Sequence, residues 1–195
     1  MRARLAIAVS GIEVELREIL LRDKAPELLA ASPKATVPVM IVDGDVIEES
    51  YDIMLWTLSK NDPETWLKRH DEALVAECDG SFKSALDRYK YGNRFEDSDA
   101  IEQRSIASGY LMKLEDILST QTYLSGEKPG MTDMSVITFV RQFANVDRKW
   151  FDAEPWPNLI NWLDDFLNSP AFADIMYKYP KWVAEAPVTL FPEPK

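Results

Sequence analysis

The sequence predicts an α/β front part followed by an all-helical remainder. Residues 39–47 hold two short apolar runs with an Asp-Gly pair between them, which is typical of a β-hairpin. From residue 66 onward, long segments have helical spacing and few helix breakers. A polar, proline-containing stretch separates these parts. We therefore expect an α/β domain at residues 1–58, a linker at 59–65 and a helical domain at 66–195.

Three elements are expected before the hairpin. Residues 1–11 favour a helix that ends at Gly11, a residue type suited to the left-handed conformation after a helix. Residues 14–19 alternate as a strand does, and residues 26–31 favour a short helix with proline in its first turn. The apolar face expected for the first helix comprises Leu5, Ala8, Val9 and Ile12.

The most informative stretch is residues 37–53, which is predicted to contain a strand, a tight turn, a return strand and the start of a helix. Asp43-Gly44 provides the turn, and Ser50 is a candidate N-cap for the helix that follows. The amino end of a helix binds carboxylates through its free N–H groups and dipole. Glu49 can accept hydrogen bonds from an ammonium group. An acid-serine pair at this position therefore suits the head group of an amino acid.

A β-branched residue and a proline, Val37-Pro38, precede this hairpin. A cis bond at that step would expose the flanking backbone for pairing with an extended ligand. The Val-Pro step, the hairpin and Glu49-Ser50 together resemble the glutathione-binding site of the cytosolic glutathione transferases. The resemblance implies a thioredoxin-like N-terminal domain, a helical C-terminal domain and glutathione as co-substrate.

The resemblance also implies roles for individual residues and partners for the protein. Val37, held by Pro38, would pair through its backbone with the cysteinyl unit of glutathione, and Glu49 and Ser50 would hold the γ-glutamyl end. Lys34 is either a contact to the glycyl carboxylate or a solvated loop lysine. The second substrate would be a small electrophile or a disulfide, and the protein would be a homodimer.

In that family a first strand and a turn with a catalytic Cys, Ser or Tyr precede the first helix. Here residues 1–11 resemble that first helix, so we expect the first strand to be absent and the catalytic residue to lie upstream of Met1. The inner edge of strand 14–19 would then expose unpaired backbone groups. Either the chain is an N-terminally shortened version of a longer protein, or another chain closes its sheet. The bacterial relatives that it most resembles carry Cys-Pro-Tyr in the turn, which favours a cysteine-type enzyme.

Composition limits the remaining classes of function. The formal net charge of −11 disfavours nucleic acid and anionic membrane surfaces as partners. No stretch of about 18 apolar residues appears, and the first residues lack the hydrophobic segment and cleavage site of a signal peptide, so a cytoplasmic location is expected. With one histidine, His70, and one cysteine, Cys78, a metal site is not expected. Cys78 is flanked by acids that raise a thiol pKa, so we expect a structural cysteine.

Two features of the helical part bear on the interpretation. Gly130 stands where the family usually has a Ser or Thr N-cap, and Asp133 can still bond back to the Gly130 N–H. Four aromatic residues could line a pocket for the second substrate, although aromatic residues at helical spacing more often form core: Tyr89, Tyr91, Tyr110 and Trp150. The rival function is a non-catalytic module of the same fold that binds a ligand or a protein, which the absence of a nucleophile favours.

Overall fold

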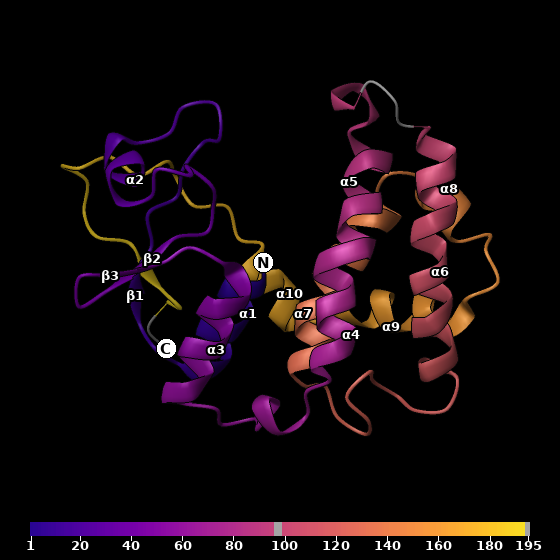
Figure 1. Cartoon of the computed structure of the whole chain (residues 1–195). Coiled ribbons are helices and arrows are strands. Elements are labelled where there is room, and N and C mark those ends of the chain that lie inside the picture. The colour runs from indigo at the N-terminus through magenta and orange to yellow at the C-terminus, as the bar shows by residue number, and fades with distance from the viewer. Residues whose placement is uncertain (96–98, 194–195) are drawn as a thin grey trace. The chain divides into compact units, whose positions relative to one another are not determined.

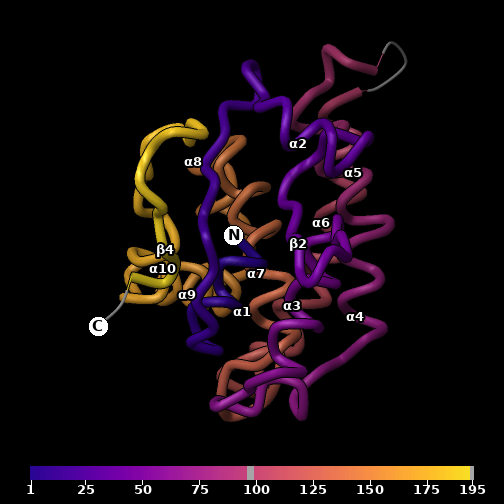
Figure 2. Tube along the Cα trace, turned by 90° about the vertical axis from the view of Figure 1, so that its left-hand side faces the viewer, coloured from indigo at the N-terminus to yellow at the C-terminus, as the bar shows by residue number. Residues whose placement is uncertain are grey.

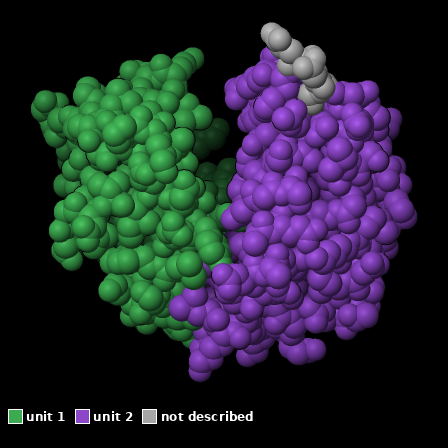
Figure 3. All heavy atoms as spheres, viewed as in Figure 1, with its two compact units in different colours: residues 1–64, 170–195 green, residues 65–169 purple. Residues whose placement is uncertain are grey.

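The computed structural model describes residues 1–95 and 99–193 (Figure 1). The chain forms two compact units, which Figure 3 shows in different colours: residues 1–64 with 170–195 (unit 1), and residues 65–169 (unit 2). Residues 170–195, which the sequence pattern predicts to belong to the helical domain, group with unit 1, because a strand near the C-terminus pairs with one near the N-terminus. None of the helices in the described ranges is long and apolar enough to cross a membrane.

Unit 1 contains short strands and four helices within the described residues. Its helices and strands are α1 (Arg2–Ser10), β1 (Val14–Glu15), α2 (Pro26–Ala31), β2 (Met40–Val42), β3 (Asp45–Ile47), α3 (Ser50–Lys60), α10 (Pro170–Ile175) and β4 (Leu190–Phe191). α1 packs against α3 and α10. Two small antiparallel sheets result, β1 with β4 and β2 with β3.

The helix α1 ends as the sequence predicts. Gly11 follows it in the left-handed region at φ 68°, and its N–H donates to the carbonyl of Ile7. The buried side differs from the expected face, because Leu5, Ala6 and Ile7 are buried whereas Ala8 and Val9 are only half-buried. Leu5 and Ala6 form the core of unit 1 with residues of α3 that include Ile53 and Met54.

The strand predicted at residues 14–19 is shorter than expected. Only Val14 and Glu15 form a ladder, and they pair antiparallel with Phe191 and Leu190. The pairing also corrects the expectation that everything after residue 66 is helical. Farther along the predicted strand, the backbone is also hydrogen-bonded to the C-terminal segment, since the Trp182 N–H donates to the Glu18 carbonyl at 2.8 Å.

Unit 2 is helical, as the sequence predicts. Its helices are α4 (Glu72–Glu77), α5 (Lys83–Lys90), α6 (Ala100–Leu118), α7 (Met131–Ala144), α8 (Arg148–Phe151) and α9 (Pro157–Leu167), with short 3₁₀ turns at Trp66–Lys68 and Gly92–Arg94. A π-helical turn at Cys78–Phe82 joins α4 to α5. α5 lies beside α6, and α7 contacts α4, α5 and α9. Cys78 is completely buried in the π-helical turn, which confirms that it is a buried, structural position.

Asp133 organises the start of α7. Its carboxylate accepts hydrogen bonds from the N–H groups of Leu124, Ser125 and Gly130 and from the Trp162 indole, at 2.8 to 3.1 Å. The bond from the Gly130 N–H confirms the prediction that Asp133 bonds back to the residue before the helix, which is the half of a capping box that a glycine permits. Burial raises the pKa of Asp133, and the hydrogen bonds that it accepts oppose this rise.

Gly130 is required here by space. A Cβ on this residue would lie 2.6 Å from the Arg69 carbonyl oxygen and 2.8 Å from the Ser125 hydroxyl. The side chain of Arg69 continues over the same loop and donates to the Pro129 carbonyl at 2.9 Å. A serine or threonine at this position would therefore collide with the backbone of residue 69.

Candidate functional site

The β2–β3 hairpin sets the position of the candidate site. Its two turn residues, Asp43 and Gly44, have φ values of 52° and 93°, and a type I′ turn requires both to be positive. The register pairs Val42 with Asp45 and Met40 with Ile47. The turn predicted from the Asp-Gly pair is thus confirmed, and it directs the chain from β3 straight into the start of α3.

The helix α3 begins one residue earlier than the sequence predicts. Ser50 is its first helical residue and Glu49 is the N-cap, so the prediction of Ser50 as N-cap is wrong by one position. Glu49 has extended dihedral angles, and its side chain forms no capping hydrogen bond. The backbone dipole makes this end of the helix positive, and no capping bond from Glu49 competes with a bound carboxylate for the first N–H groups.

Lys34 lies next to this helix end. Its ammonium is 3.0 Å from the Glu48 carboxylate and 3.7 Å from that of Glu49. The Ser32 hydroxyl, on a buried residue, donates to Glu48 at 2.5 Å. Hydrogen bonds from Ser32 and Lys34 lower the pKa of Glu48, and the bond to Glu48 raises the pKa of Lys34. A loop lysine and two adjacent acids therefore form one charged cluster.

Val37 and Pro38 precede β2 on the same hairpin. Their peptide bond is cis, and Val37 is 46% exposed whereas Pro38 is half-buried. This step therefore lies at the surface of unit 1, shortly before β2. Of the five residues predicted for the site, the structure brings Lys34 and Glu49 into direct proximity and places Ser50 beside Glu49.

Glu48 is the residue that sequence reasoning missed. Its carboxylate accepts a hydrogen bond from Ser32 and forms an ion pair with Lys34, and the residue follows β3 directly. The available signal was the pair of adjacent acids at positions 48 and 49. Because successive residues after a strand point to opposite sides, one carboxylate lies towards the loop of residues 32–34 and the other is exposed.

The first turn of α1 carries neither a thiol nor a hydroxyl group in the described chain. Its residues are Arg2, Ala3 and Arg4, and Arg4 is engaged by the Glu18 carboxylate and the Ile175 carbonyl. Cys78 belongs to unit 2 and is buried. The described site can therefore hold charged groups of a ligand, and the first turn of α1 supplies it with no thiol or hydroxyl group.

The aromatic residues considered for a second-substrate pocket fall into two groups. Tyr110 is buried and donates to the Leu74 carbonyl at 3.0 Å, and burial raises its pKa. Tyr89 is also buried, and its ring centroid lies 5.3 Å from that of Phe143. Both belong to the core of unit 2. Tyr91 and Trp150 form the second group and are half-buried. The Arg94 guanidinium lies 4.3 Å from the ring centroid of Tyr91, and the Arg104 guanidinium lies 4.1 Å from that of Trp150.

The hairpin, the helix start and the helical unit define a thioredoxin-like domain joined to an all-α domain. Residues 1–66 match the family described as "Glutathione S-transferase, N-terminal domain", and residues 66–165 match "Glutathione S-transferase, C-terminal domain". The chain belongs to the glutathione S-transferase family.

Curated relatives agree with this assignment. The chain is 28% identical over 156 residues to "Probable glutathione S-transferase parA" of Nicotiana tabacum. This match covers 73% of this chain and 67% of the relative. It is 28% identical over 185 residues to "Glutathione S-transferase U19" of Arabidopsis thaliana, which covers 89% of this chain and 82% of the relative.

Solved structures show the same fold. A glutathione transferase family member from Pseudomonas fluorescens, crystallised with two glutathione molecules, has a TM-score of 0.72 at 17% identity, covering 88% of this chain and 85% of that one. The glutathione transferase URE2P6 from Phanerochaete chrysosporium, in complex with oxidized glutathione, also has a TM-score of 0.72, at 16% identity, covering 89% and 88%.

Proposed function

We propose that this protein binds glutathione at the amino end of α3 and presents its thiol to a small electrophile or a disulfide. One observation carries the proposal. The amino end of α3, which no side chain caps, carries the Glu49 carboxylate, and the Lys34 ammonium lies beside that carboxylate. A tripeptide with one ammonium and two carboxylates has groups of opposite charge for each of them. Of the structural relatives described above, one holds two glutathione molecules and another holds oxidized glutathione.

Each site residue has a role in this proposal. The γ-glutamyl carboxylate binds the Ser50 hydroxyl and the first N–H groups of α3, while its ammonium binds Glu49. The glycyl carboxylate binds Lys34. The cysteinyl unit pairs with the backbone of Val37, which Pro38 holds in place. Charge neutralisation then fixes both ends of the tripeptide, and the thiol projects from its middle.

The thiol-activating side chain is proposed to precede α1 in the polypeptide. A group there would lie at the amino end of that helix, where the dipole stabilises a thiolate. A cysteine at this position would exchange with a disulfide by attacking one sulfur and expelling the other as a thiolate. A serine or tyrosine would donate a hydrogen bond to the glutathione thiolate during conjugation. Resemblance of residues 1–5 to the segment after Cys-Pro-Tyr in bacterial relatives favours cysteine.

A homodimer in the cytoplasm is part of the same proposal, and it rests on the family. The second candidate function is a non-catalytic binding module of this fold. The composition of the first turn of α1, without a thiol or hydroxyl, favours it. Both candidates share glutathione binding, whereas only the enzyme turns over a disulfide or an electrophile.

Calorimetric titration with glutathione tests the proposal. Wild type should bind, and Glu49→Ala should weaken binding roughly tenfold or more, because it removes the partner of the ligand's ammonium. Asp52→Ala is the matched control, since Asp52 is an exposed acid in the first turn of the same helix and has no assigned ligand contact. Negligible heat with wild type, or equal weakening by both substitutions, would contradict the proposal.

A further inference from the structure

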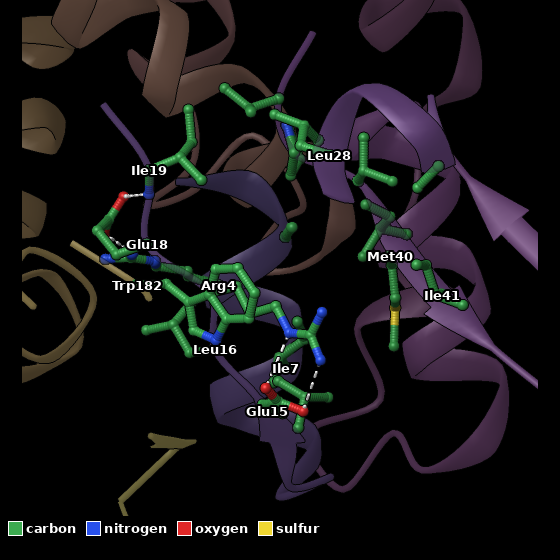
Figure 4. A pocket seen from close by; sticks show the side chains of 18 of the residues that line it. Arg4, Ile7, Glu15, Leu16, Glu18, Ile19, Leu28, Met40, Ile41 and Trp182 are labelled. Carbon is green, nitrogen blue, oxygen red and sulfur yellow. Dashed lines mark hydrogen bonds and ion pairs between the residues drawn. The ribbon is translucent and has the colours of Figure 1, made fainter. Parts of the chain in front are cut away.

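The connection that carries Lys34 is fixed at both of its ends. It joins α2 to β2, as Figure 2 shows. Leu28 of α2 and Met40 of β2, both labelled in Figure 4, line the same pocket of unit 1. Within the connection, the Ala35 N–H donates to the Ser32 carbonyl at 2.9 Å. The backbone of Lys34 lies inside this turn, whereas its side chain is 58% exposed. The direction of the ammonium therefore depends on the carboxylates around it.

Glu48 is the anchored acid of the charged cluster. One oxygen of its carboxylate accepts from the Ser32 hydroxyl at 2.5 Å, and the other lies 3.0 Å from the Lys34 ammonium. Ser32 is completely buried, and its N–H donates to the Leu28 carbonyl at 2.9 Å. Both oxygens of Glu48 are thus engaged, and the end of α2 sets the position of the carboxylate.

Glu49 differs from Glu48 in exposure and in anchoring. Its side chain is 67% exposed, compared with 24% for Glu48, and it forms no capping hydrogen bond with α3. Its carboxylate lies 3.7 Å from the Lys34 ammonium, which is farther than the carboxylate of Glu48. Lys34 thus has a near, anchored partner and a more distant, exposed one.

The two carboxylates compete for one cation. Attraction between an ammonium and a carboxylate grows as their separation falls, and an anchored partner loses less side-chain entropy on pairing than an exposed one. Both effects favour Glu48. If Glu48 is neutral, Glu49 is the acid of this pair that attracts Lys34, because lysine carries its charge on a flexible stem. An ion pair of Lys34 with Glu49 would neutralise both charges at the start of α3.

We propose that Glu48 is a positioning residue that holds the Lys34 ammonium away from Glu49, so that both charges stay available to the ligand. The inference rests on the proposed function, in which Glu49 binds the ammonium of glutathione and Lys34 binds its glycyl carboxylate. Glu48 contacts neither end of the ligand and acts through Lys34. Its charge therefore matters for binding even when the ligand has no group for Lys34.

The test uses glutathione whose glycyl carboxylate is amidated, because this ligand still needs Glu49 and cannot use Lys34. Glu48→Gln removes the charge and keeps an oxygen that accepts from Ser32. We expect this variant to bind the amidated ligand about three- to fivefold more weakly than wild type, since the ligand must displace Lys34 from Glu49. Unchanged calorimetric affinity would overturn the proposal.

A second substitution separates positioning from a structural role. Adding Lys34→Gln to Glu48→Gln removes the cation that blocks Glu49, so affinity for the amidated ligand should return to the wild-type value. If Glu48 only supported the fold of the connection, the double variant would bind as weakly as Glu48→Gln or more weakly. That result would overturn the proposal.

Asp45→Asn is the matched control for loss of a negative charge. Asp45 is an exposed acid in β3 of the same hairpin and has no assigned ligand contact. Its substitution should leave the affinity for the amidated ligand unchanged. Weakening equal to that of Glu48→Gln would show a general effect of charge and would overturn the positioning role.

A measurement without ligand distinguishes this inference from the proposed function. NMR signals of the Lys34 ε-methylene group report which carboxylate the ammonium approaches. Glu49→Gln should shift these signals at least about twofold more in the Glu48→Gln background than in wild type, because only there is Glu49 the main partner. Equal shifts in the two backgrounds would overturn the inference even if wild type binds glutathione. The predicted shifts without any binding of glutathione would support the placement of Lys34 and contradict the proposed function alone.

Discussion

The Lys34 ammonium lies 3.0 Å from the Glu48 carboxylate and 3.7 Å from that of Glu49. One cation is therefore shared between a carboxylate that Ser32 holds and a carboxylate that is exposed at the start of α3. This arrangement keeps Lys34 near the helix end, where a ligand with a carboxylate can compete for it. The predictions for the charged cluster follow from this sharing.

Lys34→Gln should weaken glutathione binding about three- to tenfold, because an exposed ion pair with the glycyl carboxylate is lost and solvent screens it. Glutathione with its glycyl carboxylate amidated should bind wild type and Lys34→Gln equally. Lys24→Gln removes the same charge elsewhere in unit 1 and should have no effect. A full loss of affinity for the amidated ligand in Lys34→Gln would instead show that Lys34 acts on another part of the ligand.

The titration of Glu48 should depend on Lys34. Its pKa in the folded protein lies below 4.5, the ordinary value, because Ser32 and Lys34 donate to the carboxylate. Since the folded protein binds this proton more weakly than the unfolded chain, the interaction stabilises the fold above pH 4.5 and is lost as the pH falls through the lowered pKa. Carbon NMR of the Glu48 carboxyl should show a midpoint below 4.5 that rises in Lys34→Gln. An identical midpoint in both proteins would argue against the pair.

Gly130→Ser should destabilise unit 2 by about 1–3 kcal/mol, although serine is a better N-cap than glycine. The new Cβ would lie 2.6 Å from the Arg69 carbonyl oxygen, and backbone must move to relieve the contact. Gly109→Ser is the control, since no atom lies within 4 Å of a Cβ there, and it should gain about 0.5 kcal/mol from helix propensity. Urea unfolding measures both. A stabilised Gly130→Ser protein would refute this reason for the glycine.

Asp133→Asn should cost about 2–5 kcal/mol of unfolding free energy. The carboxylate accepts from three backbone N–H groups and the Trp162 indole, and an amide side chain would turn a donor towards some of them. Asp165→Asn, at an exposed position of α9, should change stability by less than about 0.5 kcal/mol. Similar urea midpoints for the two variants would contradict the proposed role of Asp133.

Elements governed by local chemistry were predictable from the sequence. The helix at residues 26–31, the left-handed Gly11 and the Asp43-Gly44 turn all match the structure. Each depends on the intrinsic preference of proline or glycine within a few residues. The cap of α3 is displaced by one position because Glu49, and not Ser50, takes the extended conformation before the helix.

Features that depend on distant residues were not predictable. Glu15 pairs with Leu190 across most of the chain, and no local pattern identifies that partner. Gly130 was interpreted as a weakened cap, whereas the approach of Arg69 makes it necessary. In the candidate site, the residue types at Lys34 and Glu49 indicated a charged ligand, but Glu48 was missed because its role requires the loop at Ser32 to lie beside it.

The most direct test of the central claim is amide NMR of the protein during titration with glutathione sulfonate, which keeps both ends of the tripeptide and lacks the thiol. The account predicts saturable shifts of the Val37, Ser50 and Tyr51 amides, with the Lys34 side-chain signals moving at the same ligand concentrations. Shifts confined to unit 2, or no shifts at millimolar ligand, would contradict glutathione binding at the amino end of α3.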